Sequence, residues 1–278
     1  MRRPCLTALA IGLAATGNAR SSPWAVSAEA GGEYDTNVER VETGPGLDTA
    51  PIASGVIRLG VRADHKAELA GVNYALAVSD LSRLVSNGTA QVEDVTLLAG
   101  DVRWLHPVGD RPVSLGFGLT AADAQAVADA VGARTFVNLG GDILLQLRDT
   151  EDRRLTLAIG GRHFEYKPDE EYDWDGPTAN ARLDVTLYHS EDHTRSLELA
   201  TLLSFEARMY GSAALGKCAP GQPPDCVVAT EISRADRYQR AGVELTYVGR
   251  QVLSLGYDVS VVDSNSYGQS LLRHRVTA

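Results

Sequence analysis

The sequence is short of cysteine, of aromatic side chains and of basic charge. It contains three cysteines, and phenylalanine, tryptophan and tyrosine together make up 6% of its residues. Lysine and arginine number 26 against 36 acidic residues, which gives a formal net charge of −10 at pH 7. Because phosphate backbones bind to basic surfaces, this balance disfavours nucleic acid as a partner. The sequence also lacks a phosphate-cradling glycine loop and a nucleophile-elbow motif, and so lacks two common signals of an enzyme.

Long hydrophobic runs are missing as well, except at the start of the chain. Two basic residues precede an apolar stretch at residues 5–16, and Gly17-Asn18-Ala19 offers the small residues that a signal peptidase reads. The stretch is too short for a comfortable membrane-spanning helix, so residues 1–19 are predicted to be a secretory signal, with an ordinary buried helix as the alternative. The predicted mature domain, residues 20–278, has no apolar run long enough to span a membrane as a helix. In a membrane it would have to be a β-barrel.

Two of the three cysteines, Cys218 and Cys226, fall in this mature domain. In an exported protein an even number of cysteines close together in sequence indicates a disulfide. A zinc site would need further cysteines or nearby histidines, and this stretch has none. We therefore expect a disulfide between Cys218 and Cys226.

The clearest positive signal is a strand pattern at residues 136–148. Successive side chains of a strand point to opposite faces. One face would carry Val137, Leu139, Gly141, Ile143, Leu145 and Leu147. The other would carry charged or polar residues such as Asn138, Asp142 and Arg148. Helical spacing would scatter both sets around the axis. The stretch also exceeds the roughly nine to eleven residues with which a tilted strand crosses a bilayer.

About twelve such segments follow one another along the chain. Their connections alternate between short ones, at about residues 64–66, 106–111, 149–152, 190–195 and 249–250, and mostly longer ones, at 35–52, 82–90, 121–132, 167–177, 211–229 and 263–268. This rhythm is typical of outer-membrane barrels, which have short periplasmic turns and longer outer loops. The sequence therefore predicts an all-β fold: an up-and-down antiparallel transmembrane β-barrel of about twelve strands. It would lie in the cell outer membrane with membrane lipid around it. A secreted β-sandwich or a soluble β-barrel is the alternative.

A few segments fit this pattern less well. The apolar side chains change parity between residues 95–99 and 102–104, which predicts a β-bulge near Gly100. Residues 121–132 are rich in alanine and could form a short helical loop. The last extended segment, residues 270–278, begins shortly before the sequence stops, which leaves open whether the barrel is complete at this end or cut short.

The polar faces of these strands define the candidate site, the lumen of the barrel. The predicted lumen-lining residues are Arg58, Arg62, Asp142, Arg148, Arg162, Arg182, Asp184, Glu198, Glu206, Arg208, Arg240, Glu244 and Asp258. Glycines recur on the same face, as expected in a crowded and strongly curved interior: Gly60, Gly71, Gly116, Gly118, Gly140, Gly160, Gly242 and Gly256. One interpretation is an internal salt-bridge network that fills the lumen, because buried charges must be paired. The other is a polar channel for a small solute, with little preference for one sign of charge.

Two segments carry a family resemblance. Residues 32–38 read Gly-Glu-Tyr-Asp-Thr-Asn-Val, and residues 267–275 read Tyr-Gly-Gln-Ser-Leu-Leu-Arg-His-Arg. Together with the signal and the topology, they resemble Gram-negative outer-membrane barrels, in particular the barrel portion of surface lipoprotein assembly modifiers. The resemblance implies a role in exporting a surface protein or lipoprotein. That family has periplasmic helical repeats before its barrel and usually ends in an aromatic residue; here the predicted signal leads almost directly into the first strand, and the given sequence stops at Val276-Thr277-Ala278.

No residue set predicts catalysis, so no catalytic residue, metal or cofactor is expected. Residues 167–176 gather five carboxylates, but their spacing does not fit a full calcium-loop pattern, and a solvated acidic loop with Trp174 at its tip is the preferred interpretation. His163 and the His189-Ser190 pair leave a lipid-modifying hydrolase as a third functional hypothesis, behind a channel and a structural or binding barrel. The expected partners are lipid and either a small solute or an exported surface protein.

Overall fold

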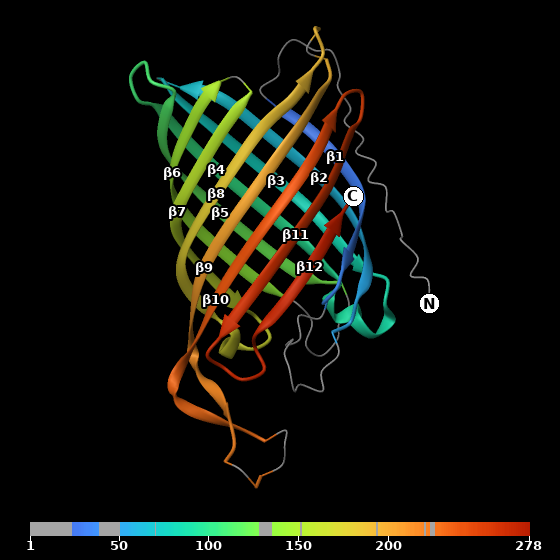
Figure 1. Cartoon of the computed structure of the whole chain (residues 1–278), viewed down its shortest axis with the longest axis vertical. Coiled ribbons are helices and arrows are strands. Elements are labelled where there is room, and N and C mark those ends of the chain that lie inside the picture. The colour runs from blue at the N-terminus through green and yellow to red at the C-terminus, as the bar shows by residue number, and fades with distance from the viewer. Residues whose placement is uncertain are drawn as a thin grey trace.

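The two-residue alternation that runs through the sequence forms twelve antiparallel strands in the computed structural model (Figure 1). The structure describes residues 24–38, 51–69, 71–127, 135–150, 152–192, 194–219, 221–222 and 226–278. The predicted signal at residues 1–19 lies outside this part. The strands are β1 (Trp24–Asp35), β2 (Ser54–Leu69), β3 (Val72–Val85), β4 (Val95–Pro107), β5 (Val113–Ala126), β6 (Phe136–Thr150), β7 (Arg153–Tyr166), β8 (Trp174–His189), β9 (Ser196–Lys217), β10 (Val227–Val248), β11 (Val252–Ser264) and β12 (Leu271–Thr277).

Each strand pairs with its neighbours in sequence, and β1 pairs with β12 to close the barrel. All of these pairings are antiparallel, which is the up-and-down topology that the sequence predicts. Two short 3-10 helices, η1 (Gly88–Glu93) and η2 (Glu170–Tyr172), lie in connections between strands. No helix in the described ranges is long and apolar enough to cross a membrane.

The two ends of the barrel differ in their connections. The short connections after β2, β4, β6, β8 and β10 share one end, here called the short-turn end. The longer connections after β1, β3, β5, β7, β9 and β11 share the other, here called the long-loop end, which lies at the bottom of Figure 1. The predicted alternation of short and long connections is confirmed for most of the barrel; the connections after β8 (residues 190–195) and β11 (residues 265–270) are equally long, at six residues each.

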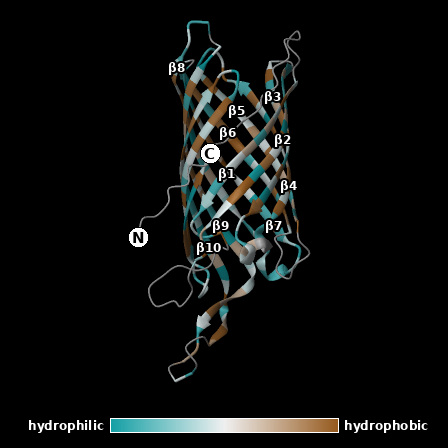
Figure 2. Cartoon of the chain, turned by 90° about the vertical axis from the view of Figure 1, so that its right-hand side faces the viewer, coloured by the Kyte–Doolittle hydropathy of each residue, from teal (hydrophilic) through white to brown (hydrophobic). Residues whose placement is uncertain are grey.

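The barrel carries its apolar side chains on the outside. Hydrophobic and hydrophilic residues alternate along the strands of the wall (Figure 2). The outward members of neighbouring strands lie in register, as Ile143 of β6 does with Ile159 of β7, and these two side chains are 72% and 69% exposed. The described residues contain only a small buried apolar cluster, at the long-loop end, formed by Val38, Val56, Val85 and Ala90 with Ile52 against it. A protein that buries its apolar surface on itself would show the reverse distribution.

Strand β6 contains the segment with the clearest sequence pattern. Its predicted apolar face, from Val137 to Leu147, points outward, and Asn138, Asp142 and Arg148 point inward. The predicted orientation of this strand is confirmed.

Several local predictions are wrong. The pairing of β4 with β3 and β5 runs without a register shift, so the predicted bulge near Gly100 is absent. The parity changes because Leu97 faces inward, opposite Leu81 of β3, whereas Trp104 faces outward. The apolar side chains of this strand therefore occupy both faces.

The first short turn also lies later than predicted. Asp64, His65 and Lys66 belong to β2, and the chain reverses at Gly71, whose φ of +76° places it in the left-handed region that suits glycine. Gly71 is thus a turn residue and is not on the inner face. The alanine-rich segment predicted as a helical loop begins instead as strand, since β5 runs to Ala126, and residues 128–134 lie outside the described part.

The cysteine segment is shorter than predicted, because β9 and β10 extend into it. The two strands continue past the rest of the barrel as a ribbon at the long-loop end (Figure 1). The predicted disulfide between Cys218 and Cys226 closes the tip of this ribbon. Along the ribbon, the backbone N–H of Tyr267 donates to the carbonyl oxygen of Leu215, which ties the ribbon to the β11–β12 connection.

The barrel is closed by a short ladder. The register between β1 and β12 holds three residue pairs, from Glu33 with Thr277 to Asp35 with Arg275. Backbone hydrogen bonds between Gly32 and Ala278 and from Thr36 to His274 extend it at both ends. The other neighbouring strands pair over much longer registers, so closure relies on few backbone bonds.

Candidate functional site: the inner face of the barrel

The strand registers place all thirteen predicted lumen residues on the inner face. Ten of them form ion pairs: Arg58 with Glu29, Arg62 with Asp64, Arg162 with Asp142, Arg154 and Arg182 with Asp184, Arg208 with Glu206, and Arg240 with Asp258. Arg148, Glu198 and Glu244 have no ion-pair partner within the described ranges. The inner face is therefore a surface of mostly paired charges.

A buried group of charges lies where β1 meets β12. Here the carboxylate of Asp35, with a fully buried side chain, accepts hydrogen bonds from Nε of Arg273 at 2.8 Å and from Nη2 of Arg83 at 3.1 Å. Arg83 also lies 2.7 Å from Glu33, reaching across β2. We call this group, together with Arg275, the closure network.

Arg275 connects the closure network to the predicted site. Its Nε donates to Asp258 at 2.8 Å, and its Nη1 lies 3.7 Å from Glu33. Asp258 in turn accepts from Arg240 at 3.1 Å. Only Asp258 and Arg240 of this chain of contacts were predicted. The closure residues could have been found from the sequence only by the alternation of side chains along a strand. Glu33 and Asp35 share a face of the first strand, and Arg273 and Arg275 share a face of the last one.

Two glycines make room for the pair between Arg162 and Asp142. A Cβ added at Gly140 would lie 2.6 Å from Cδ of Arg162, and one added at Gly160 would lie 2.5 Å from Oδ1 of Asp142. Glycine at these positions lets each long side chain lie flat across the neighbouring strand. The carboxylate of Asp142 accepts from Arg162 at 2.9 Å and also from the hydroxyl of Thr178 at 3.3 Å. The guanidinium of Arg162 is thereby held at a fixed place on the inner wall.

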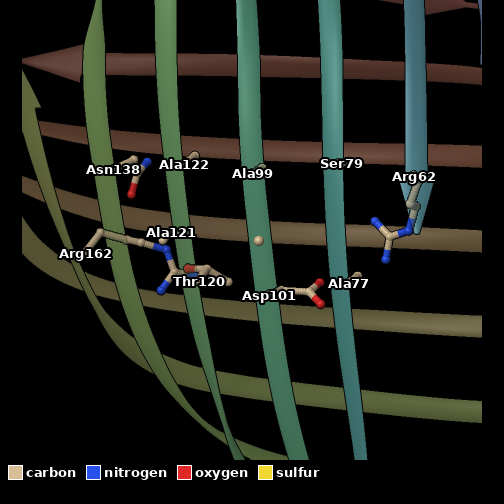
Figure 3. Close-up of a pocket in the computed structure, with 11 residues that line it drawn as sticks. Arg62, Ala77, Ser79, Ala99, Asp101, Thr120, Ala121, Ala122, Asn138 and Arg162 are labelled. Carbon is tan, nitrogen blue, oxygen red and sulfur yellow. The ribbon is translucent and has the colours of Figure 1, made fainter. Parts of the chain in front are cut away.

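A pocket of about 250 Å³ lies beside Arg162 on the wall formed by β2 to β7. It is lined by Arg62, Ala77, Ser79, Ala99, Gly100, Asp101, Thr120, Ala121, Ala122, Asn138 and Arg162. Arg162 and Arg62 lie at its two ends with Asp101 between them (Figure 3). Most of the lining side chains are small, and the hollow exists for that reason.

Nearer the long-loop end, a row of planar side chains in contact crosses five strands of the inner wall. Phe136, Phe164 and Trp174 follow one another with ring centroids 4.9 and 5.6 Å apart. The guanidinium of Arg208 then lies 4.8 Å from the Trp174 ring and 4.4 Å from the Tyr238 ring. Trp174 is 6% exposed. The prediction that it forms an exposed contact at a loop tip is wrong, because it begins β8 and points inward.

In the described part of the chain, His163 contacts a carboxylate and His189 contacts a backbone oxygen. Nδ1 of His163 lies 2.8 Å from Oδ1 of Asp175, on the outer face. The hydroxyl of Ser190 donates to Asp192 at 2.5 Å, and the contact of His189 with Ser190 is to its backbone oxygen. The hydroxyls of Ser190 and Thr194 lower the pKa of Asp192 to about 2 and fix this turn.

The described residues contain no cluster of three or more side chains suited to bind a metal ion. In the acidic segment, Asp169 accepts from the backbone N–H of Glu171 at 3.0 Å and so caps η2. This carboxylate has a structural partner in the loop itself.

No family model matches the chain, and no curated protein matches it. Among solved structures, LpxR from Salmonella typhimurium is 11% identical with a TM-score of 0.39, over 90% of this chain and 99% of that chain. A BenF-like porin from Pseudomonas fluorescens Pf-5 is 8% identical with a TM-score of 0.33, over 97% of each chain. OccAB3 from Acinetobacter baumannii is 7% identical with a TM-score of 0.27, over 97% of this chain and 98% of that chain. Similarity at this level adds no argument about function to what the strand pairing and the inner face show.

Proposed function

We propose that this chain is an outer-membrane protein whose barrel spans the bilayer and provides a passive polar passage for small solutes. The observation that carries the proposal is the exposed apolar band on the outside of a closed barrel. Closure satisfies the backbone hydrogen bonds within the wall, as lipid requires of any spanning structure. The large exposed side chains of this band include Ile57, Leu59, Val61, Leu119, Ile143, Ile159, Leu203 and Leu255.

An arc of aromatic rings near the short-turn end supports the same placement. On the outer face, Trp24 lies 4.6 Å from His65, and His65 lies 5.6 Å from Tyr74, measured between ring centroids. Tyr74 is in register with Trp104, whose ring lies 4.4 Å from that of Phe117. Aromatic side chains favour the boundary between lipid and water, so this arc marks where one leaflet ends. In the proposed orientation the short-turn end is periplasmic and the long-loop end faces outward.

The passage is inferred from the inner face. Its charges are of both signs and mostly paired, which suits polar solutes and gives little preference for one sign of ion. Proteoliposomes containing the purified chain test this proposal: we expect channel conductance and swelling in small uncharged solutes. Empty liposomes and liposomes with heat-unfolded protein are the controls. A purified, folded barrel that supports neither conductance nor uptake would refute the passage.

The closure network favours a second candidate, a structural or surface-displaying barrel whose lumen is filled by salt bridges. Its buried charges at the long-loop end could stabilise a barrel that displays the β9–β10 ribbon without transporting anything. In that case Asp35→Asn, which removes the central charge of the closure network, should lower stability and leave flux at its background. The export role implied by the resemblance to lipoprotein assembly modifiers stays a sequence-based prediction, as does the expectation that the chain is not an enzyme.

Location is tested first. We expect the protein in the outer-membrane fraction, with migration on a gel that changes when the sample is boiled, because folded barrels resist unfolding by detergent. Protein recovered in the soluble periplasmic fraction would overturn the proposed function as a whole.

A further inference from the structure

The pocket beside Arg162 has a chemistry that the passage itself does not require. It lies on the inner wall, between the guanidinium groups of Arg162 and Arg62 (Figure 3). Its volume, about 250 Å³, corresponds to roughly eight water molecules at about 30 Å³ each. That is below the range of about 300–1,000 Å³ for sites of drug-sized ligands. A single six-membered ring with its substituents is an occupant of about this size.

The charges at the pocket cancel. Each charged lining residue has an opposite charge within 4 Å: Arg162 and Asp142 at 2.9 Å, Arg62 and Asp64 at 2.8 Å, Asp101 and Arg103 at 3.5 Å. An ion entering such a site loses its hydration shell and meets no net opposite charge in return. The electrostatics thus disfavour a simple anion or cation as the occupant.

Unused hydrogen-bonding groups nevertheless point to an occupant. The side chains of Ser79, Thr120 and Asn138 make no hydrogen bond within the described ranges, although all three line the pocket. Arg62 donates to Asp64 from Nε and Nη2 and makes no bond from Nη1. Hydroxyl groups can both donate to such acceptors and accept from such donors. A solute with several hydroxyls would satisfy these groups at once.

Part of the pocket floor is apolar. Ala99 and Ala122 lie in register on adjacent strands and present neighbouring methyl groups, with Ser79 and Asn138 on either side of them in the same transverse row of the wall. A saturated ring with hydroxyls around its rim has an apolar C–H face that packs against such methyls while its rim reaches the polar groups. The pocket thus combines one apolar side with a polar edge.

We propose that this pocket is a binding site for a neutral polyhydroxylated solute of monosaccharide size. The proposal rests on the proposed function in so far as the pocket lies on the inner wall of the passage, and it names the class of solute that the passage retains. Gly140 keeps the site open, because a side chain there would displace Arg162. The polar groups and the methyl floor come from β2 to β7, so the site is confined to one half of the wall.

Saturation-transfer NMR on the full chain in detergent micelles tests the site, with D-glucose as the probe and succinate as a charged comparison. We expect transfer to glucose in the wild type and its loss in Ala99→Leu, which fills the pocket. Ala200→Leu, on the inner face of β9, is the matched control and should bind as the wild type does. Folding of Ala99→Leu is judged by its unboiled gel band. If this variant does not fold, Asn138→Ala is used in its place, and we expect it to bind glucose about tenfold more weakly than the wild type does.

The binding and flux assays separate the two proposals. Glucose binding without proteoliposome uptake retains the site and refutes the passage. The site is refuted, and the passage retained, if the proteoliposomes take up solute but the wild type does not bind glucose. The same conclusion follows if glucose binding is unchanged in Ala99→Leu or in Asn138→Ala. Preferential binding of succinate that disappears in Arg62→Gln would overturn the inference in favour of an anion site.

Discussion

Replacing Asp35 by asparagine removes the central charge of the closure network with almost no change in shape. The side chain of Asp35 is fully buried, whereas those of Arg273 and Arg83 are 13% and 12% exposed. The substitution leaves Arg273 with a single distant carboxylate, Glu33, at 3.9 Å. Arg83 keeps its contact with Glu33 at 2.7 Å. One of the two arginines is therefore left close to unpaired in a buried place.

The expected loss follows from these contacts. Removing one partner of a buried ion pair costs about 3–5 kcal/mol, because the remaining charge stays desolvated. Asparagine retains an oxygen that can accept from Arg273, and Arg83 stays paired, so the lower end applies, at about 3 kcal/mol. Asp184→Asn is the control. Asp184 also pairs with two arginines, but those side chains are nearly half exposed, and such a pair contributes about 0–1 kcal/mol.

Urea unfolding of the barrel in phospholipid vesicles, followed by tryptophan fluorescence, measures both variants. The double variant Asp35→Asn with Arg273→Gln should recover part of the loss, since it leaves no unmatched charge from that pair. If Asp35→Asn lowers the free energy of unfolding no more than Asp184→Asn does, the closure network does not stabilise the barrel and the reasoning is wrong.

Three further outcomes follow from other parts of the fold. Ile143→Arg, on the outer face, should destabilise the barrel in vesicles by about 2–4 kcal/mol, whereas Asn138→Arg, on the inner face of the same strand, should be tolerated; equal losses would contradict the lipid-facing assignment. Replacing both Cys218 and Cys226 by serine should speed proteolysis at the ribbon tip and leave the gel band of the folded, unboiled barrel unchanged. Loss of that band would show that the disulfide stabilises the barrel wall and not only the ribbon. NMR titration of Asp192 should give a pKa of about 2, and this pKa should rise towards 3.8 in Ser190→Ala. Because the pKa of Asp192 is lowered in the folded protein, its stabilisation of this turn is present above pH 4 and is lost as the pH falls towards 2.

Most of the wall could be predicted from the sequence, because period-two alternation is a local signal. Residues 136–148 show it most cleanly, since the outward face of β6 is apolar throughout, although Phe136 and Leu144 face inward. The prediction was wrong for β4, where Leu97 packs inward opposite Leu81 and the apolar residues occupy both faces. A rule that assigns every apolar side chain to lipid cannot anticipate an apolar patch inside the barrel.

The site was less accessible to sequence analysis. Alternation placed Arg162 and Asp142 on one face, but their pairing depends on Gly140 and Gly160, which leave room for the two side chains. The closure network joins residues more than two hundred positions apart, as in the contact of Asp35 with Arg273. The alternation of side chains along each strand predicts that such residues face the lumen. Which of them are in contact depends on the register between strands, which the sequence does not give.

The short ladder between β1 and β12 has a consequence for the order in which the barrel assembles. Every other ladder joins strands that are neighbours in the sequence and can form as a hairpin, with little loop entropy to overcome. The last ladder joins the two ends of the sheet, so it forms only after the sheet has curled far enough to bring them together. We expect it to be the last ladder to form and the first to open, and the Asp35→Asn variant should therefore unfold faster while the hairpins form at an unchanged rate.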